Sequence, residues 1–77
     1  MKAVLYRQPP NGNQGYEQEL DVLKETETAW IASKNPEVFP QWKISKQDNS
    51  LKVKYPGEKA FRQPKGYGSY QFLRVEG

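Results

Sequence analysis

The stretch QWKISKQDNSLKVKY, residues 41–55, decides the fold, because apolar and polar residues alternate on both sides of a turn signal. Asp48 and Asn49 tolerate left-handed backbone angles and can hydrogen-bond to their own backbone, as tight turns require. A turn centred on them, or a four-residue loop over residues 47–50, predicts a β-hairpin with a single register. That register pairs Trp42 with Tyr55, Lys43 with Lys54, Ile44 with Val53, Ser45 with Lys52 and Lys46 with Leu51.

The predicted hairpin has two different faces. The apolar face carries Trp42, Ile44, Leu51, Val53 and Tyr55, and the polar face carries Lys43, Ser45, Lys52 and Lys54. Lysines directly opposite one another cost about 0.2–1 kcal/mol, so the polar face needs an explanation. Two remain open: solubility and protection of a sheet edge, or contact with an anion such as a phosphate backbone or an acidic protein patch.

The preceding segment, residues 16–34, admits two interpretations. Leu20, Leu23, Trp30 and Ile31 follow a helical spacing, which would give one helix at 17–34 packed on a four-stranded sheet. Alternation on both sides of a turn at residues 24–27 gives two strands instead. The glutamates and threonines of residues 25–28 would leave a helix without apolar contacts for about two turns, whereas a hairpin places them at a solvated bend. We therefore expect the hairpin.

The two ends of the chain predict one strand each. Residues 2–7 form the first strand, and residues 70–75 form the last, with Leu73 and Val75 on one face and Tyr70 and Phe72 on the other. The segments 8–16 and 56–69, rich in proline and glycine, are expected to be mobile loops. The prediction is a single all-β domain over residues 1–77, a small SH3-like barrel of about five to six antiparallel strands.

One resemblance supports the hairpin interpretation of residues 16–34. The segment ETETAWI at 25–31, followed after a gap by WKISKQ at 42–47, resembles a pattern in small uncharacterised phage and bacterial proteins. In those proteins an ETE-x-A strand precedes a strand that begins with tryptophan, and the whole resembles a small SH3-like barrel. The resemblance covers about a third of the chain and implies no activity.

Composition argues against catalysis. The 77 residues include no cysteine and no histidine, which removes the thiolate, the usual general base and the commonest metal ligands. Carboxylate pairs such as Glu25 with Glu27 are expected to be solvated, because so short a chain rarely builds a walled cleft. We expect no enzyme activity, no cofactor, no metal and no small-molecule substrate. The lack of a signal-like or membrane-spanning apolar run predicts a cytoplasmic protein without a membrane partner.

Charge is divided unevenly along the chain. Residues 1–39 hold four Lys/Arg and six Asp/Glu, a net charge of −2, whereas residues 40–77 hold eight and three, a net charge of +5. Such a division indicates a charged partner. Basic residues alternate with aromatic ones in the loop 56–69, as in nucleic-acid binders.

These features predict a non-enzymatic binding module, with nucleic-acid backbone as the favoured partner. The predicted contact residues are Lys43, Lys52, Lys54, Arg62, Lys65 and Tyr67. The alternative is a protein-binding adaptor or inhibitor, possibly phage-encoded, that docks on a larger protein. It would use the edge of the strand at 50–55 or the acidic stretch at 17–27.

Overall fold

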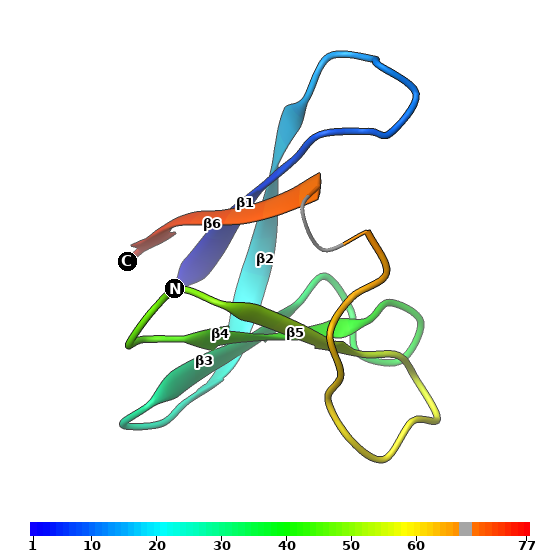
Figure 1. The fold of residues 1–77 in the computed structure, drawn as a ribbon. Coiled ribbons are helices and arrows are strands. Elements are labelled where there is room, and N and C mark those ends of the chain that lie inside the picture. Colours follow the sequence, from blue (N-terminus) through cyan, green and yellow to red (C-terminus); the bar gives the residue numbers. More distant parts are fainter. Residues whose placement is uncertain (67–68) are drawn as a thin grey trace.

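Six antiparallel strands form one curled sheet (Figure 1). The computed structural model describes residues 1–66 and 69–77. The strands are β1 (Lys2–Arg7), β2 (Tyr16–Glu25), β3 (Ala29–Ser33), β4 (Gln41–Ser45), β5 (Leu51–Lys54) and β6 (Tyr70–Glu76), in the sheet order β5-β4-β3-β2-β1-β6. The all-β prediction is confirmed. The helix alternative at 17–34 is wrong, since that segment is the β2–β3 hairpin.

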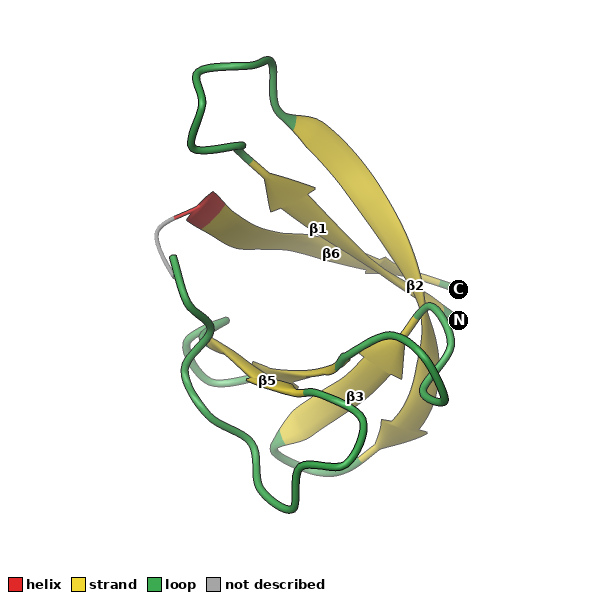
Figure 2. Ribbon diagram, turned by 90° about the vertical axis from the view of Figure 1, so that its right-hand side faces the viewer, coloured by secondary structure: helices red, strands yellow, loops and turns green. Residues whose placement is uncertain are grey.

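Strand β2 joins the two halves of the sheet. Its first part, residues 16–21, pairs with β1, its last part, residues 21–25, pairs with β3, and a β-bulge at Leu23 interrupts the β2–β3 ladder. A bulge bends its strand and increases the local twist. The sheet therefore curls at this point into a half-barrel, with β1 and β6 on one side and β3, β4 and β5 on the other (Figure 2). This arrangement is consistent with a small SH3-like barrel.

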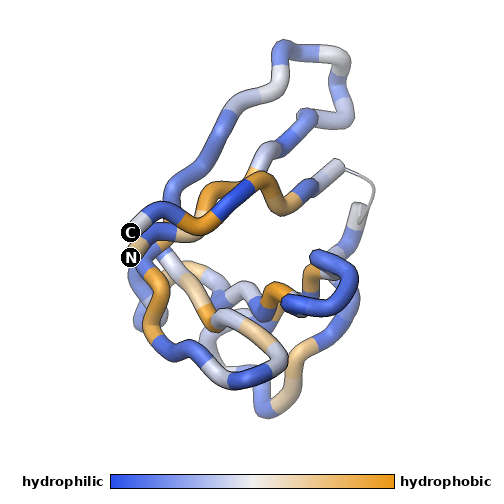
Figure 3. The backbone as a smooth tube through the Cα atoms, turned by 90° about the vertical axis from the view of Figure 1, so that its left-hand side faces the viewer, coloured by the Kyte–Doolittle hydropathy of each residue, from blue (hydrophilic) through white to orange (hydrophobic). Residues whose placement is uncertain are grey.

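The core fills the concave side of the curl. Its buried members are Ala3, Leu5, Leu20, Ala32, Trp42, Ile44, Leu51 and Val53. Two aromatic contacts connect the halves: Trp30 stacks on Phe72 with ring centroids 5.7 Å apart, and Trp42 meets Tyr70 at 4.8 Å. The apolar residues of the core follow the strands, whereas the loop after β1 is polar (Figure 3).

The β4–β5 hairpin keeps its predicted faces but not its predicted register. The observed pairs are Gln41–Lys54, Trp42–Val53, Lys43–Lys52 and Ile44–Leu51, so the loop is residues 46–49. Asn49 has a φ of 61° and its N–H donates to the Ser45 carbonyl, so the left-handed residue ends the loop instead of centring it. Because the shift is two residues, the side chains stay on the same faces. Lys43 therefore faces Lys52, and Tyr55 lies beyond the ladder.

The last strand corrects a second expectation. A bulge in the β1–β6 ladder pairs Val4 with Arg74 and Leu5 with Phe72, which leaves Leu73 unpaired. The extra residue changes the alternation, so Val75 packs on the core together with Phe72 and Tyr70. The predicted grouping of Val75 with Leu73 is wrong for this reason.

The long loop after β5 returns to the edge of the sheet. Tyr55 accepts a hydrogen bond from the Glu58 N–H across a turn that contains Gly57 at a φ of 89°. Arg62 then exchanges both backbone hydrogen bonds with Val53, at 2.7 and 2.9 Å. The edge at 50–55, expected to be exposed for a partner, is therefore occupied at its centre. The mobility of the loops 8–16 and 56–69 stays a prediction.

The left-handed position at Asn49 gives a stability test of the hairpin loop. Asn49→Val should lower the free energy of unfolding by about 1–3 kcal/mol, because a β-branched residue is strained at this φ. Asn49→Gly should leave it within about 0.5 kcal/mol, because glycine adopts this φ without strain. Urea unfolding followed by tryptophan fluorescence measures both. Equal effects of the two substitutions would contradict the observed loop geometry.

Candidate nucleic-acid interface

Three lysines form a row across the outer face of the sheet. Lys24 pairs with Ile31, Ile31 with Lys43, and Lys43 with Lys52. Directly opposite residues project from the same face, and neighbouring strands lie about 4.8 Å apart. Their neighbours on β4 and β5 belong to the buried core, so the row faces solvent. Strands β2, β4 and β5 each contribute one exposed ammonium group.

Lys54 extends this row toward the long loop. It pairs with Gln41 in the adjacent position of the hairpin, so it projects from the same face as Lys43 and Lys52. Lys54 and Lys43 both contact the Phe61 ring. The Nζ of Lys54 lies 5.0 Å from the ring centroid, and the Nζ of Lys43 lies 5.8 Å from it. Cation–π contacts of this kind hold long side chains over the surface. We call Lys24, Lys43, Lys52 and Lys54 the lysine surface.

Hydroxyl groups border the lysine surface on its other side. Lys43 and Lys52 line a shallow, open hollow together with Thr28, Ala29, Ser45 and Ser50. Ser45 lies between Ala29 and Ser50 in the next outward-facing position of the ladder. Hydroxyl and ammonium groups are the side chains that contact phosphate oxygens in nucleic-acid complexes. The residues lining the hollow that the structure describes include no carboxylate, so their net charge is positive.

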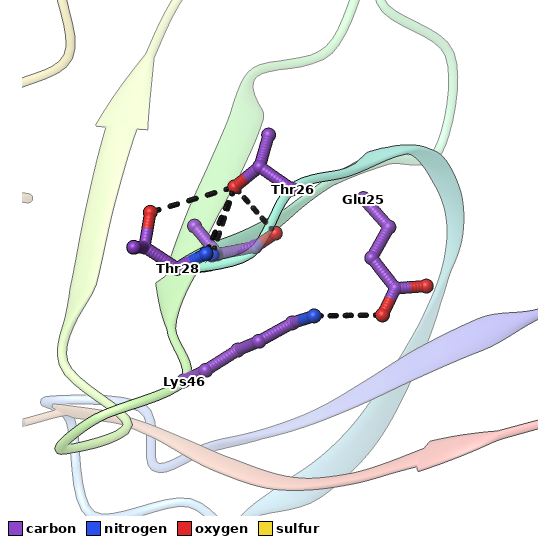
Figure 4. Close-up of polar contacts among 5 residues, drawn as sticks. Glu25, Thr26, Thr28 and Lys46 are labelled. Atoms are coloured by element: carbon purple, nitrogen blue, oxygen red, sulfur yellow. Dashed lines mark hydrogen bonds and ion pairs between the residues drawn. The ribbon is translucent and has the colours of Figure 1, made fainter.

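Three of the five carboxylates in the acidic stretch at 17–27 are paired with cations from elsewhere in the chain. Glu25 accepts from the Lys46 Nζ at 2.7 Å, beside the turn in which the Thr26 hydroxyl binds the backbone of residues 28 and 29 (Figure 4). Glu17 binds Arg74 at 3.1 Å, and Asp21 binds Lys2. Such exposed pairs add little stability, but they cancel charge locally. Within residues 1–66 and 69–77, no lysine of the lysine surface forms an ion pair.

The structure places the described members of the sequence-predicted contact residues at three locations. Lys43, Lys52 and Lys54 share the lysine surface. Arg62 lies on the edge of β5, where its Nε contacts Glu58 at 3.2 Å and its guanidinium lies 5.3 Å from the Tyr55 ring centroid. Lys65 lines a separate cleft. Tyr67 lies outside the described residues.

Sequence reasoning missed two basic residues. Lys24 was grouped with the acidic half, because the bulge at Leu23 that brings it into the row of lysines has no clear sequence signal. Arg7 was treated only as the end of a strand, yet its guanidinium lies 5.0 Å from the Tyr70 ring centroid and its Nε is buried. The positions of both residues follow from strand register: that of β2 with β3 for Lys24, and that of β1 with β6 for Arg7.

Three carboxyl groups have pKa values below their ordinary range. Hydrogen bonds from Ser50 lower the pKa of Asp48 within the hairpin loop, with a smaller contribution from Ser45. The ammonium of Lys2 lowers the pKa of Asp21. The Tyr55 N–H, then Arg62, lowers the pKa of Glu58. Each group is therefore ionised near neutral pH, where these contacts stabilise the fold.

Metal-ligating clusters and membrane-spanning helices are absent from the part of the chain that the structure describes. No group of three or more metal-ligating side chains occurs among these residues. No helix within them is long and apolar enough to span a membrane. No family model, curated protein or solved structure matches the chain. The resemblance to small phage and bacterial proteins therefore stays a prediction.

The lowered pKa of Asp48 predicts the acid response of the hairpin loop. Its contribution to stability should be fully present above the unfolded pKa of about 3.9 and lost as pH falls through the lower folded pKa. Asp48→Asn should lack this dependence, so wild-type and variant stabilities should converge in acid. Carboxyl NMR titration and urea unfolding between pH 2 and pH 7 test this. A folded-state pKa at or above the unfolded value would contradict it.

Proposed function

We propose that this protein is a non-enzymatic nucleic-acid-binding module that contacts the phosphate backbone through its lysine surface. The observation that carries the proposal is the row of Lys24, Lys43 and Lys52, bordered by hydroxyl groups and without ion pairs among the described residues. Like charges in adjacent strands cost free energy unless an anion neutralises them. A polyanion that passes over the row would remove that repulsion and release its own counterions.

The distribution of acids supports the same proposal. Carboxylates at 17, 21 and 25 are engaged by Arg74, Lys2 and Lys46, so the acidic stretch repels a polyanion less than its sequence suggests. The ion pairs Lys2–Asp21 and Arg74–Glu17 lie on the β1–β2–β6 half of the sheet, whereas Lys43 and Lys52 lie on the other half. A nucleic acid on the lysine surface would therefore meet mainly positive charge.

Protein docking is the second candidate function. Val38 and Phe39, in the loop between β3 and β4, expose 66% and 47% of their surface. An exposed apolar pair on a small protein suits a protein partner better than a phosphate backbone.

If docking is the function, Val38→Ser with Phe39→Ser should abolish a nuclease-resistant complex, and Lys43→Gln with Lys52→Gln should preserve it. A cytoplasmic location stays a prediction for either function.

Salt dependence is the test of the nucleic-acid proposal. Fluorescence anisotropy with a labelled 12-nucleotide single strand and a 12-base-pair duplex should show affinity that falls steeply between 50 and 200 mM salt. Lys43→Gln with Lys52→Gln should weaken binding to both. For the single strand it should reduce the slope of log K against log salt by about 1.4, because each lost phosphate contact contributes about 0.7.

Lys34→Gln is the matched control, because this exposed lysine lies in the β3–β4 loop with its Nζ 5.6 Å from the Phe39 ring centroid. This substitution removes one positive charge from a residue that does not belong to the lysine surface. If Lys34→Gln and the single Lys43→Gln weaken binding equally, general net charge, and not this surface, is responsible. Absence of binding at 50 mM salt would overturn the proposal.

A further inference from the structure

A cleft lies at the end of the half-barrel where three strand termini meet. Arg7 ends β1, Tyr55 follows β5, and Tyr70 begins β6; Pro10, Lys65, Gly66 and Ser69 complete the lining. Figure 1 shows the loop after β5 descending and then turning back up toward the level of β6. The cleft has a volume of about 370 Å³, which is within the range of small-molecule sites.

The polar groups of the cleft are donors suited to an anion. Arg7 and Lys65 supply two positive charges, and Ser69 adds a hydroxyl group. The buried Nε of Arg7 has no hydrogen-bond partner within the described part of the chain, although buried donors are normally paired. Glu58 contacts the neighbouring Tyr55, but its two oxygens are already bound by the Tyr55 N–H and by Arg62. The described residues that line the cleft include no carboxylate.

Among the described residues, the aromatic groups of the cleft offer one ring for stacking. Tyr70 is enclosed, because Trp42 and Arg7 both pack against its ring. Tyr55 is 45% exposed and contacts the Arg62 guanidinium at 5.3 Å from its centroid. Two contacts hold Tyr55 at the mouth of the cleft: the Arg62 guanidinium packs on its ring, and its own backbone N–H donates to Glu58. Exposed aromatic rings next to cations are the usual platform for unstacked bases.

We propose that this cleft binds one nucleotide of a single-stranded nucleic acid. The phosphate lies against Arg7, Lys65 and Ser69, and the base stacks on Tyr55. The inference rests on the proposed function and sharpens it: the lysine surface attracts any polyanion, whereas the cleft selects a strand whose bases are free. A duplex keeps its bases stacked inside the helix, so it cannot fill the cleft without paying to unstack one.

A titration with adenosine 5′-monophosphate tests the cleft directly. In ¹H–¹⁵N NMR spectra of the full chain, we expect the amide signals of Arg7, Tyr55, Lys65, Ser69 and Tyr70, and the Arg7 Nε–H signal, to shift. Adenosine alone and inorganic phosphate alone should each bind more weakly than the nucleotide, because each lacks half of the contacts. Shifts confined to the lysine surface, or no shifts at millimolar nucleotide, would overturn the inference.

Two variants at exposed positions test the preference for single strands. Tyr55→Leu and Lys65→Gln should each weaken binding of the 12-nucleotide strand about five-fold or more, and leave duplex binding within about two-fold. Tyr55→Phe keeps the ring and should behave like the wild type. Lys59→Gln is the charge control, because this exposed lysine belongs to the same loop but does not line the cleft.

The outcomes separate the two proposals. If oligonucleotides bind but Tyr55→Leu and Lys65→Gln match their controls, the cleft inference is wrong and the lysine surface stands alone. If neither strand nor duplex binds, the proposed function is wrong. Cleft shifts with the mononucleotide in that case would indicate a site for free nucleotides, which contradicts selection of a strand.

Discussion

The contact between aromatic rings across the open side of the sheet is the interaction on which the rest depends. Strands β5 and β6 are the edges of the curl, so the two halves, joined on one side through β2, are held together on the open side by side-chain packing. Trp30 on Phe72 and Trp42 on Tyr70 supply the largest side chains of that packing. Truncation of a buried tryptophan typically costs about 3–5 kcal/mol. In a domain this small that is most of the stability, so the geometry of both candidate surfaces depends on these two pairs.

Charge on this protein is organised by the sheet and not by position in the sequence. Lys2, Lys46 and Arg74 lie far along the chain from Asp21, Glu25 and Glu17, and strand pairing brings these partners together. The same pairing brings Lys24 into one row with Lys43 and Lys52, with Ile31 between Lys24 and Lys43. A sequence with a negative half and a positive half therefore folds into a molecule with one neutralised surface and one cationic surface.

The sequence was most informative where a period of two persisted through a strand. The faces of Trp42, Ile44, Leu51 and Val53 followed from alternation, and alternation does not depend on the choice of register. The register itself depended on whether Asp48 or Asn49 took the left-handed angle, and both residues tolerate it. The two bulges could not be predicted from the sequence, because a bulge depends on how two paired strands fit together. Those bulges account for the misassigned face of Val75 and for the overlooked Lys24, and the cleft required the fold to bring Arg7 to Tyr55.

The bulge at Leu23 gives β2 an uncommon sensitivity to chain length. Continuation of the upstream ladder without the extra residue would pair Leu23 with Ile31 and turn Lys24 toward the core. One inserted residue thus decides whether an ammonium group faces solvent or the apolar interior. Evolution of this surface is therefore expected to tolerate exchange of side chains in β2 more readily than gain or loss of a single residue there. The number of residues between Val22 and the Thr26 turn therefore determines whether Lys24 belongs to the lysine surface.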